Sequence, residues 1–92
     1  MKLLYSPGVK EFLSRLNPEQ KKEIREVLEG LHLDPYRGKA LQRELMGFFS
    51  LRIKRYRIVY KFFLDENIIR IYMVGPRRTI YEEFTKSLIK IG

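Results

Sequence analysis

The spacing of apolar residues changes midway along this chain, and the change limits the folds it can adopt. Up to Leu33, apolar side chains recur every three or four residues, as they do on one face of an α-helix. From Phe49 onward they alternate with polar residues or occupy runs rich in β-branched and aromatic side chains, as they do in strands. A helical half followed by a strand-rich half predicts a domain of the α+β class.

Two start signals precede the predicted helices. Ser6-Pro7 and Asn17-Pro18 each place a capping side chain before a proline, which suits the first helical position. The first helix should run for about three turns, and the second should end near Leu33, because Asp34-Pro35 follows. Each has one apolar stripe, so together they should form an αα-hairpin.

Strands are predicted before and after this hairpin. The expected strands are residues 2–5, 49–54, 56–64 and 68–74, with a turn at Gly47, a hairpin turn at 65–67 and a break at Gly75-Pro76. Residues 40–46 fit either a strand or one helical turn, and a strand is favoured. A last helix should begin at Thr79. The expected order is β-α-α-β-β-β-α, with a small curved antiparallel sheet packed on the hairpin in one domain, residues 1–92.

Positive charge is concentrated in the strand-rich half. Between Arg37 and Arg78 there are eleven lysines and arginines and three acids, a surplus of eight that equals the whole formal net charge of +8. Charge confined to one structural element indicates a polyanionic partner, and nucleic acid is the best candidate.

Several other classes of site are excluded or disfavoured by the residues present. The chain has no cysteine, which excludes disulfides and thiolate metal sites. We expect no metal and no small-molecule cofactor, because the acids Asp65 and Glu66 fit a turn and the single histidine, His32, fits the end of a helix. No apolar run approaches the roughly 20 residues that span a bilayer, so a cytoplasmic protein without membrane contact is expected.

The basic strands suggest how the chain would hold a phosphate chain. Arg52 and Lys54 lie two residues apart on one predicted strand, so their side chains should point to the same face. Arg57 and Lys61 share a face of the next strand. Antiparallel pairing would bring these four cations together, and Arg77 and Arg78 follow the last strand. Clustered cations with few acids nearby favour phosphate binding over a solvated basic face.

One metal-free reaction needs only such groups. RNA is cleaved when its 2′-OH attacks the adjacent phosphodiester, and arginines around the phosphate stabilise the charge of the transition state. A proton acceptor is also required. Tyr81, four residues after Arg77 and in the first turn of the expected last helix, would have its phenolate form favoured by nearby cations and the helix dipole. Packing of Tyr81 against the sheet is an equally good interpretation.

Three segments resemble the RelE/ParE superfamily of toxins from toxin–antitoxin systems. They are Gly38-Lys-Ala-Leu-Gln-Arg-Glu-Leu-Met-Gly47, Leu51-Arg-Ile-Lys-Arg-Tyr-Arg-Ile-Val-Tyr60 and Val74-Gly-Pro-Arg-Arg-Thr-Ile-Tyr81. The basic turn followed by tyrosine is more similar to the RelE branch. The resemblance implies a ribosome-dependent endoribonuclease that cuts mRNA in the ribosomal A site and arrests translation.

The resemblance also implies roles for individual residues. Arg57 would stabilise the reacting phosphate, and Arg77 would support the leaving group or the charge of the transition state. Arg52 would hold the RNA backbone, and Tyr81 would be the general base or a stacking platform. RNA-binding roles are expected for a further set: Lys39, Lys54, Arg55, Lys61 and Arg78. An acidic antitoxin should cover the basic patch.

One position departs from the family pattern. Some members have a lysine where this chain has Ser50, and serine cannot replace a lysine in proton transfer. Activity would then be weaker, or Tyr81 would do more of the proton transfer. The alternatives are a ParE-like toxin that inhibits DNA gyrase by binding it, and an inactive homologue that only binds RNA or its antitoxin.

Overall fold

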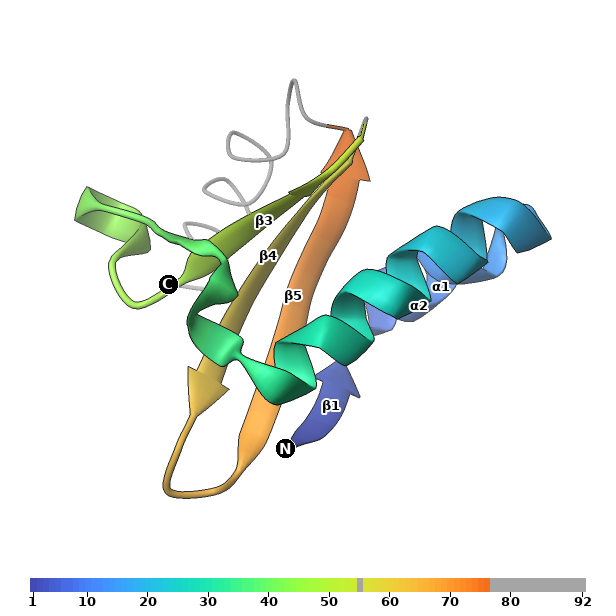
Figure 1. Ribbon diagram of the computed structural model, residues 1–92. Helices are drawn as coiled ribbons and strands as arrows, with labels where there is room; N and C mark the ends of the chain where they lie inside the picture. Colours follow the sequence, from blue (N-terminus) through green and yellow to red (C-terminus); the bar gives the residue numbers. More distant parts are fainter. Residues whose placement is uncertain (55, 77–92) are drawn as a thin grey trace.

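The computed structural model describes residues 1–54 and 56–76, which form a five-stranded sheet with two helices on one face (Figure 1). The elements are β1 (Lys2–Tyr5), α1 (Pro7–Ser14), α2 (Pro18–Leu33), β2 (Lys39–Ala40), β3 (Phe49–Ile53), β4 (Tyr56–Phe63) and β5 (Ile68–Pro76). Two 3-10 helices, η1 (Pro35–Arg37) and η2 (Arg43–Leu45), flank β2. The predicted α+β class is confirmed. The last helix predicted from Thr79 lies outside the described residues.

Both helices begin where the sequence signals predict, although their N-cap side chains form different hydrogen bonds. At α2, Asn17 Oδ1 accepts a hydrogen bond from the Gln20 amide at 2.8 Å, and Gln20 Oε1 accepts one from the Asn17 amide at 3.3 Å. This is a complete capping box. Ser6 occupies the N-cap position of α1, but its hydroxyl donates to the Tyr72 carbonyl at 3.0 Å. The start of α1 is thereby attached to β5.

The strand order across the sheet is β1-β5-β4-β3-β2. Neighbouring strands are antiparallel except that β1 runs parallel to β5, with Lys2 opposite Ile68 and Tyr5 opposite Ile71. The prediction of an antiparallel sheet is therefore wrong at this edge. Parallel neighbours need a long connection, and the chain from α1 to β4 provides it.

Three predicted segment boundaries are also corrected. Residues 40–46 contain only the end of the two-residue strand β2, followed by η2, whose Arg43 has a left-handed φ of 58°. Strand β3 ends at Ile53, one residue early, because Lys54 has a φ of 48°. Strand β5 continues through Gly75-Pro76 instead of breaking there. Proline, which lacks an N–H, is tolerated at this strand end because β1 pairs only with the first residues of β5.

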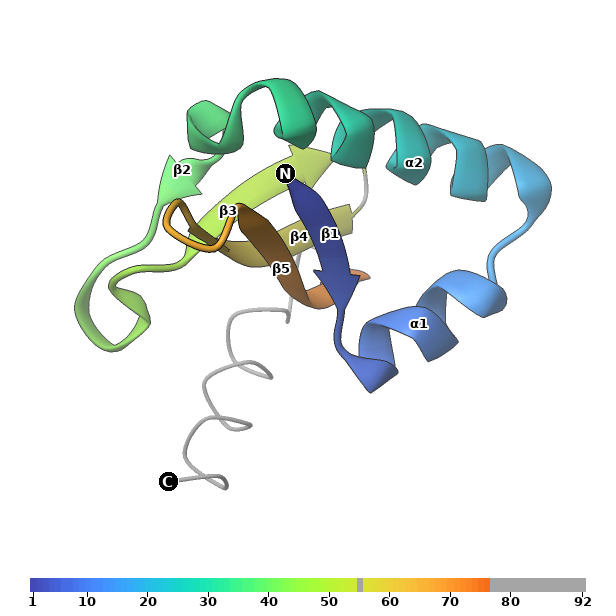
Figure 2. The ribbon, with the colours of Figure 1, turned by 90° about the horizontal axis from the view of Figure 1, so that it is seen from below.

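The main core lies between the helices and the sheet. Figure 2 shows α2 crossing one face of the sheet, with α1 beside the β1 and β5 side. The buried residues of this core come from both helices and from β3, β4 and β5: Val9, Ile24, Leu28, Leu31, Ile53, Ile58, Tyr60, Ile69, Ile71 and Val74. The opposite face has a smaller apolar cluster around Leu45 and Val59. Side chains of the central strands therefore pack on both faces of the sheet.

Candidate functional site on the outer face of the sheet

Alternation along β3 and β4 separates apolar from basic side chains. Ile53 and Ile58 are buried under the helices, so Arg52 and Arg57 project from the opposite side of the sheet. We call this side the outer face, defined by Ser50, Arg52, Arg57, Val59, Lys61, Arg70 and Tyr72. The register places Arg52 directly opposite Arg57. Two of the three arginines expected to be catalytic are therefore brought to opposed positions by the strand register.

A second pair of cations lies on the same face. Lys61 on β4 is directly opposite Arg70 on β5. Like charges directly opposite each other on neighbouring strands lower stability. Two such pairs concentrate positive charge on one face of the sheet, which favours the binding of an anion there. Arg70 was not among the site residues predicted from the sequence, although it is basic and lies in a predicted strand.

Ser50 lies beside Arg57. Its side chain is 2% exposed, and its Oγ accepts a hydrogen bond from Arg57 Nη1 at a long 3.4 Å. The residue that sequence reasoning treated only as a missing lysine thus contacts the arginine expected to bind the phosphate. A buried lysine there would place a further cation against Arg57, so the serine suits the charge of this neighbourhood.

A pocket of about 380 Å³ adjoins Arg57 at the edge of the sheet. Its other walls come from the segment around β2 and from η2: Lys39, Ala40, Leu41, Gln42 and Leu45. Lys39 was expected to bind RNA, and the structure places it at the same pocket as Arg57 even though the two are far apart in sequence. The pocket lining combines apolar side chains with two cations, which suits a group attached to a phosphate.

The segment that leads into this pocket is held by a buried tyrosine. Tyr60 is fully buried, its hydroxyl donates to the Pro35 carbonyl at 2.7 Å, and it accepts from the Gly38 amide at 2.9 Å. A Cβ at Gly38 would lie 2.6 Å from that hydroxyl and 2.7 Å from the Ser50 carbonyl, so the close approach requires glycine. Burial raises the pKa of Tyr60, against the lowering effect of the Gly38 hydrogen bond. Tyr60 therefore stays protonated and has a positioning role.

Aromatic rings lie next to the cations on the outer face. The Lys61 ammonium is 5.3 Å from the centre of the Phe48 ring and 5.5 Å from that of Phe63. Phe48 packs edge-on against Tyr72 with ring centres 5.2 Å apart. Aromatic surfaces beside a cationic groove are a common means of holding single-stranded nucleic acid. Sequence reasoning did not single out Phe48 or Tyr72, because a half-buried aromatic on a strand has no distinctive spacing.

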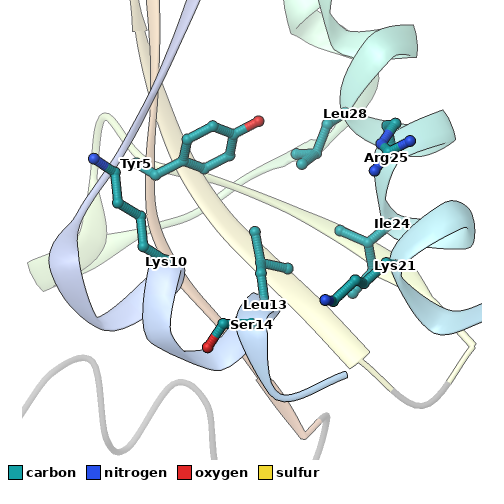
Figure 3. Close-up of a pocket in the computed structure, with 8 residues that line it drawn as sticks. All are labelled: Tyr5, Lys10, Leu13, Ser14, Lys21, Ile24, Arg25 and Leu28. Carbon is teal, nitrogen blue, oxygen red and sulfur yellow. The ribbon is translucent and has the colours of Figure 1, made fainter. Parts of the chain in front are cut away.

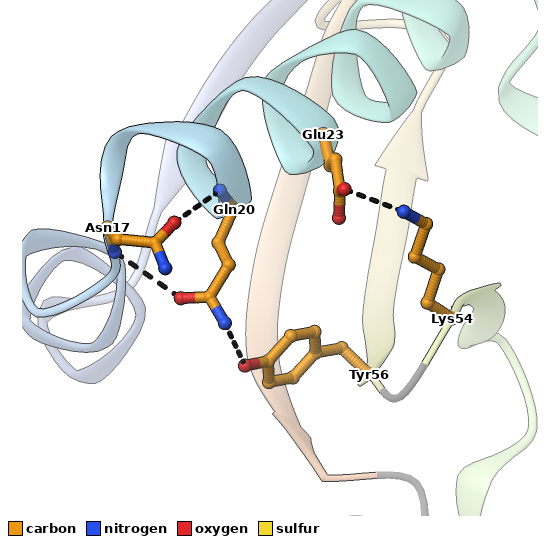
Figure 4. A network of polar contacts seen from close by, with 5 residues as sticks. All are labelled: Asn17, Gln20, Glu23, Lys54 and Tyr56. Atoms are coloured by element: carbon orange, nitrogen blue, oxygen red, sulfur yellow. Dashed lines mark hydrogen bonds and ion pairs between the residues drawn. The ribbon is translucent and has the colours of Figure 1, made fainter.

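Lys54 lies elsewhere, so the prediction that it shares a face with Arg52 is wrong. Its left-handed backbone turns the side chain toward α2, where its ammonium contacts Glu23 Oε1 at 2.7 Å (Figure 4). The hydrogen bond and the negative charge of Glu23 raise the pKa of Lys54. In the same network, Gln20 Nε2 donates to the Tyr56 hydroxyl at 3.3 Å. These contacts fasten both sides of the β3–β4 turn to α2.

Several of the remaining predicted residues are not among those that the structure describes. Arg55, Arg77, Arg78 and Tyr81 lie outside the described residues, and their roles stay predictions. His32 is exposed in the last turn of α2. Within residues 1–54 and 56–76 there is no group of three or more histidine or acidic side chains able to hold a metal ion. No helix in that part of the chain is long and apolar enough to cross a membrane.

Solved structures with this arrangement are toxins of toxin–antitoxin systems. A chain of the RelBE2 toxin–antitoxin complex from Mycobacterium tuberculosis is 29% identical, with a TM-score of 0.74, covering 83% of this chain and 90% of that one. The YoeB–YefM complex from Staphylococcus aureus matches at 25% identity and a TM-score of 0.67, over 82% and 94% of the two chains. The YoeB/ParE toxin from Agrobacterium tumefaciens matches at 20% identity and a TM-score of 0.72, over 84% and 99%.

Sequence comparison gives the family. No curated protein sequence matches the chain. The family model of the ParE toxin of the type II toxin–antitoxin system parDE matches residues 3–81, which is most of the chain. The chain therefore belongs to this ParE toxin family and is a toxin of a type II toxin–antitoxin system of the RelE/ParE superfamily.

Proposed function

We propose that this toxin cleaves mRNA in the ribosomal A site and thereby inhibits translation. The observation that most supports the proposal is the direct cross-strand pairing of Arg52 with Arg57 on the outer face. Two arginines at directly opposed positions on neighbouring strands could donate hydrogen bonds to the two unesterified oxygens of a phosphodiester.

The reaction would need no metal. The 2′-oxygen of a nucleotide would attack the adjacent phosphorus and the bond to the 5′-oxygen would break. The products would be a 2′,3′-cyclic phosphate and a 5′-hydroxyl, whose proton would come from water. Arg57 would stabilise the negative charge that develops on the phosphate oxygens, and Arg52 would fix the backbone. Arg77 would stabilise the leaving 5′-oxygen, as the family resemblance implies. Such preorganised cations commonly account for a large part of the rate enhancement in reactions of this kind.

The proton of the attacking 2′-OH would go to Tyr81. Among the tyrosines of the described residues, burial raises the pKa of both Tyr5 and Tyr60, so neither suits a general base. Tyr60 also uses its hydroxyl to hold the backbone at Pro35 and Gly38. As the family resemblance implies, the proposal keeps Tyr81 as base or, if another group takes the proton, as a stacking platform.

Mapping mRNA ends after incubation with programmed ribosomes tests the proposal. We expect new 5′ ends within the codon in the A site, and none when ribosomes are omitted. Intact message at a stoichiometric amount of toxin would contradict it. RNA binding without any cleavage would identify the chain as an inactive homologue that only binds.

A second candidate function follows from the family model, whose description is a ParE toxin. A ParE-like toxin would inhibit DNA gyrase by binding it, without nuclease chemistry. The same preparation can be added to supercoiling reactions. Gyrase-dependent DNA breaks that persist when Tyr81 is replaced by phenylalanine, together with intact mRNA, would favour this function over RNA cleavage.

A further inference from the structure

A hydrogen-bonded loop closes the pocket at the edge of the outer face. The loop leaves β2, forms η2 and returns to β3, and its two ends are joined by a hydrogen bond from the Leu41 amide to the Phe48 carbonyl at 2.9 Å. Inside the loop, the Leu45 amide donates to the Gln42 carbonyl at 3.1 Å, and the Phe48 amide donates to the Leu45 carbonyl at 3.1 Å. We call residues 41–48 the pocket loop.

Two residues of the pocket loop have left-handed backbone angles. Gly47 has a φ of 97°, which glycine adopts readily, but Arg43 has a φ of 58°, which a residue with a side chain rarely adopts. Such a conformation persists only where the surrounding structure imposes it, and it is found most often at binding and catalytic sites. Arg43 directly follows Gln42, so this backbone angle helps to set the direction in which the loop presents Gln42.

Leu45 fastens the pocket loop to the outer face. It is 9% exposed and packs with Val59, which is fully buried on β4. Leu41 is packed against the same cluster. The loop therefore gives the pocket a fixed apolar wall, and the remaining lining includes Lys39 and Arg57. A flat apolar group that carries a phosphate matches this combination of apolar wall and cations.

Strand register explains why the two cations reach the same pocket. Lys39 on β2 lies opposite Ser50 on β3, and Ser50 lies opposite Val59 on β4. Ser50 Oγ accepts the hydrogen bond from Arg57 Nη1, so Lys39 and Arg57 reach the pocket from either side of Ser50. In the part of the chain that the structure describes, Lys39 forms no ion pair with an acid. The two cations are therefore placed to bind one phosphate.

Gln42 adds an amide to this pocket. Its side chain is exposed, does not cap η2, and forms no hydrogen bond to another described residue. A side-chain amide has an oxygen that accepts and an NH₂ group that donates. It can therefore form two hydrogen bonds with any group that presents a donor beside an acceptor. Among the described residues that line the pocket, Gln42 alone has this pattern.

Adenine is the RNA base that this amide matches best. In single-stranded RNA the base edges are open to side chains. Adenine presents the N6 donor beside the N7 acceptor, and glutamine binds this pair through both ends of its amide. Guanine presents two acceptors, N7 and O6, at the same edge, and these suit arginine or lysine. The amide therefore favours adenine over guanine.

We propose that the pocket binds one adenine of the RNA, next to the phosphate at Arg57, and that Gln42 is a specificity-determining residue. The base would lie against Leu41 and Leu45 while Lys39 and Arg57 bind the phosphate. The inference deepens the proposed function and rests on it, because it requires RNA to be the ligand of the outer face. It adds a base preference that cations alone do not provide, since they bind phosphates of any sequence.

Binding of short RNAs that cannot be cleaved tests the proposal. The probes are fluorescein-labelled tetranucleotides with methylated 2′-hydroxyls, which carry either one adenine or one guanine among uridines. Fluorescence anisotropy gives Kd for full-length wild type, Gln42→Ala and Gln42→Arg. The matched control is Glu44→Ala, which truncates an exposed residue of η2 that does not line the pocket. Circular dichroism checks that each variant is folded.

We expect the wild-type toxin to bind the adenine probe about fivefold or more tightly than the guanine probe. Gln42→Ala should bring the two Kd values within about twofold of each other. Gln42→Arg should reverse the preference, because arginine pairs with N7 and O6 of guanine. Glu44→Ala should keep the wild-type ratio. Comparison of two probes on one variant cancels the general effect of a changed charge on RNA affinity.

The outcomes separate this inference from the proposed reaction. Equal binding of both probes by the wild type, or an unchanged Kd ratio in Gln42→Ala, would overturn the inference while leaving RNA cleavage on ribosomes in place. A toxin that prefers the adenine probe but leaves mRNA intact would overturn the reaction and keep the inference. A lack of affinity for both probes would overturn the inference together with the RNA-binding role of the outer face.

Discussion

The molecule has two cationic surfaces that differ in their surroundings. On the outer face, Arg52 and Arg57 are fixed opposite each other by strand pairing, and Ser50 contacts Arg57. On the helical side, a pocket of about 260 Å³ lies between β1, α1 and α2, with an apolar floor and with Lys21 and Arg25 at its edge (Figure 3). We call it the hairpin pocket. The first arrangement presents closely spaced charges along a rigid sheet, and the second presents charges around an apolar floor.

This difference teaches that charge alone does not define a partner. Cations on neighbouring strands repel and suit a continuous polyanion such as an RNA backbone. Cations separated by an apolar floor present no continuous row of phosphate contacts, so equal charge there does not predict RNA binding. On the outer face, Gln42 would add a preference for one base, which charge does not supply.

The largest expected effect that separates the surfaces comes from Arg57→Ala. Loss of one charge-stabilising group at a reaction centre commonly lowers the rate by about 100-fold to 1,000-fold. We therefore expect the rate of mRNA cleavage to fall by at least about 100-fold. Arg25→Ala, the matched loss of a cation at the hairpin pocket, should change this rate less than about threefold, because that pocket lies on the helical side of the sheet. Single-turnover cleavage measures both rates. A fully active Arg57→Ala toxin would remove Arg57 from the reaction centre.

Tyr60→Phe should affect the outer face through stability and positioning. It leaves the part-buried Gly38 amide and Pro35 carbonyl without the hydroxyl, at a cost of about 1–3 kcal/mol. For a domain of this size each kcal/mol lowers Tm by about 4–8 °C. The control is Tyr36→Phe, whose side chain is 60% exposed. An unchanged Tm and unchanged cleavage for Tyr60→Phe would show that the segment at Pro35–Gly38 needs no anchor.

Lys61→Ala should weaken RNA binding evenly across sequences. Removal of one phosphate contact should lower the slope of log affinity against log salt by about 0.7 for single-stranded RNA. Arg15→Ala is the matched control, because Arg15 is on α1 and pairs with Glu11. Fluorescence anisotropy between low and moderate salt measures the slope. Equal slopes for wild type and Lys61→Ala would exclude Lys61 from the phosphate contacts.

The smallest expected effect is that of Lys54→Met, since Lys54 is exposed and bound to Glu23 on the helical side. Glu23 raises the pKa of Lys54 above its ordinary value of 10.5. Because the pKa is higher in the folded state, the stabilisation by this ion pair is complete at pH values below the pKa of the unfolded state. It is lost as the pH rises through the pKa of the folded state. The Tm difference between wild type and Lys54→Met should therefore be constant at neutral pH and shrink above about pH 10.5. A difference that grows with pH would contradict this.

Local signals predicted most of the elements. Asn17-Pro18 and Asp34-Pro35 predicted both ends of α2, and the alternation around Leu51 predicted β3. Such signals depend on neighbours along the chain, which the sequence displays directly. The parallel pairing of β1 with β5 was not predictable in this way, because it joins residues 66 positions apart, such as Lys2 and Ile68.

The candidate site was predictable only in part. Arg52 and Arg57 were found because basic residues alternate with apolar ones along predicted strands. Lys54 was misplaced because a left-handed φ at a non-glycine residue has no reliable local signal. Ser50 was seen as a missing charge and not as a neighbour of Arg57, since that contact depends on the side-chain arrangement.

The sequence by itself determined the α+β class, both helices, the main strands and the concentration of charge in the strand-rich half. These follow from hydrophobic periodicity, capping and composition, which act over a few residues. The tertiary structure alone decided that Arg52 faces Arg57, that Lys39 shares a pocket with Arg57, and that Lys10, Lys21 and Arg25 surround one hollow. Strand register and the packing of α1 against α2 set these neighbours, and both depend on contacts between residues far apart in the chain.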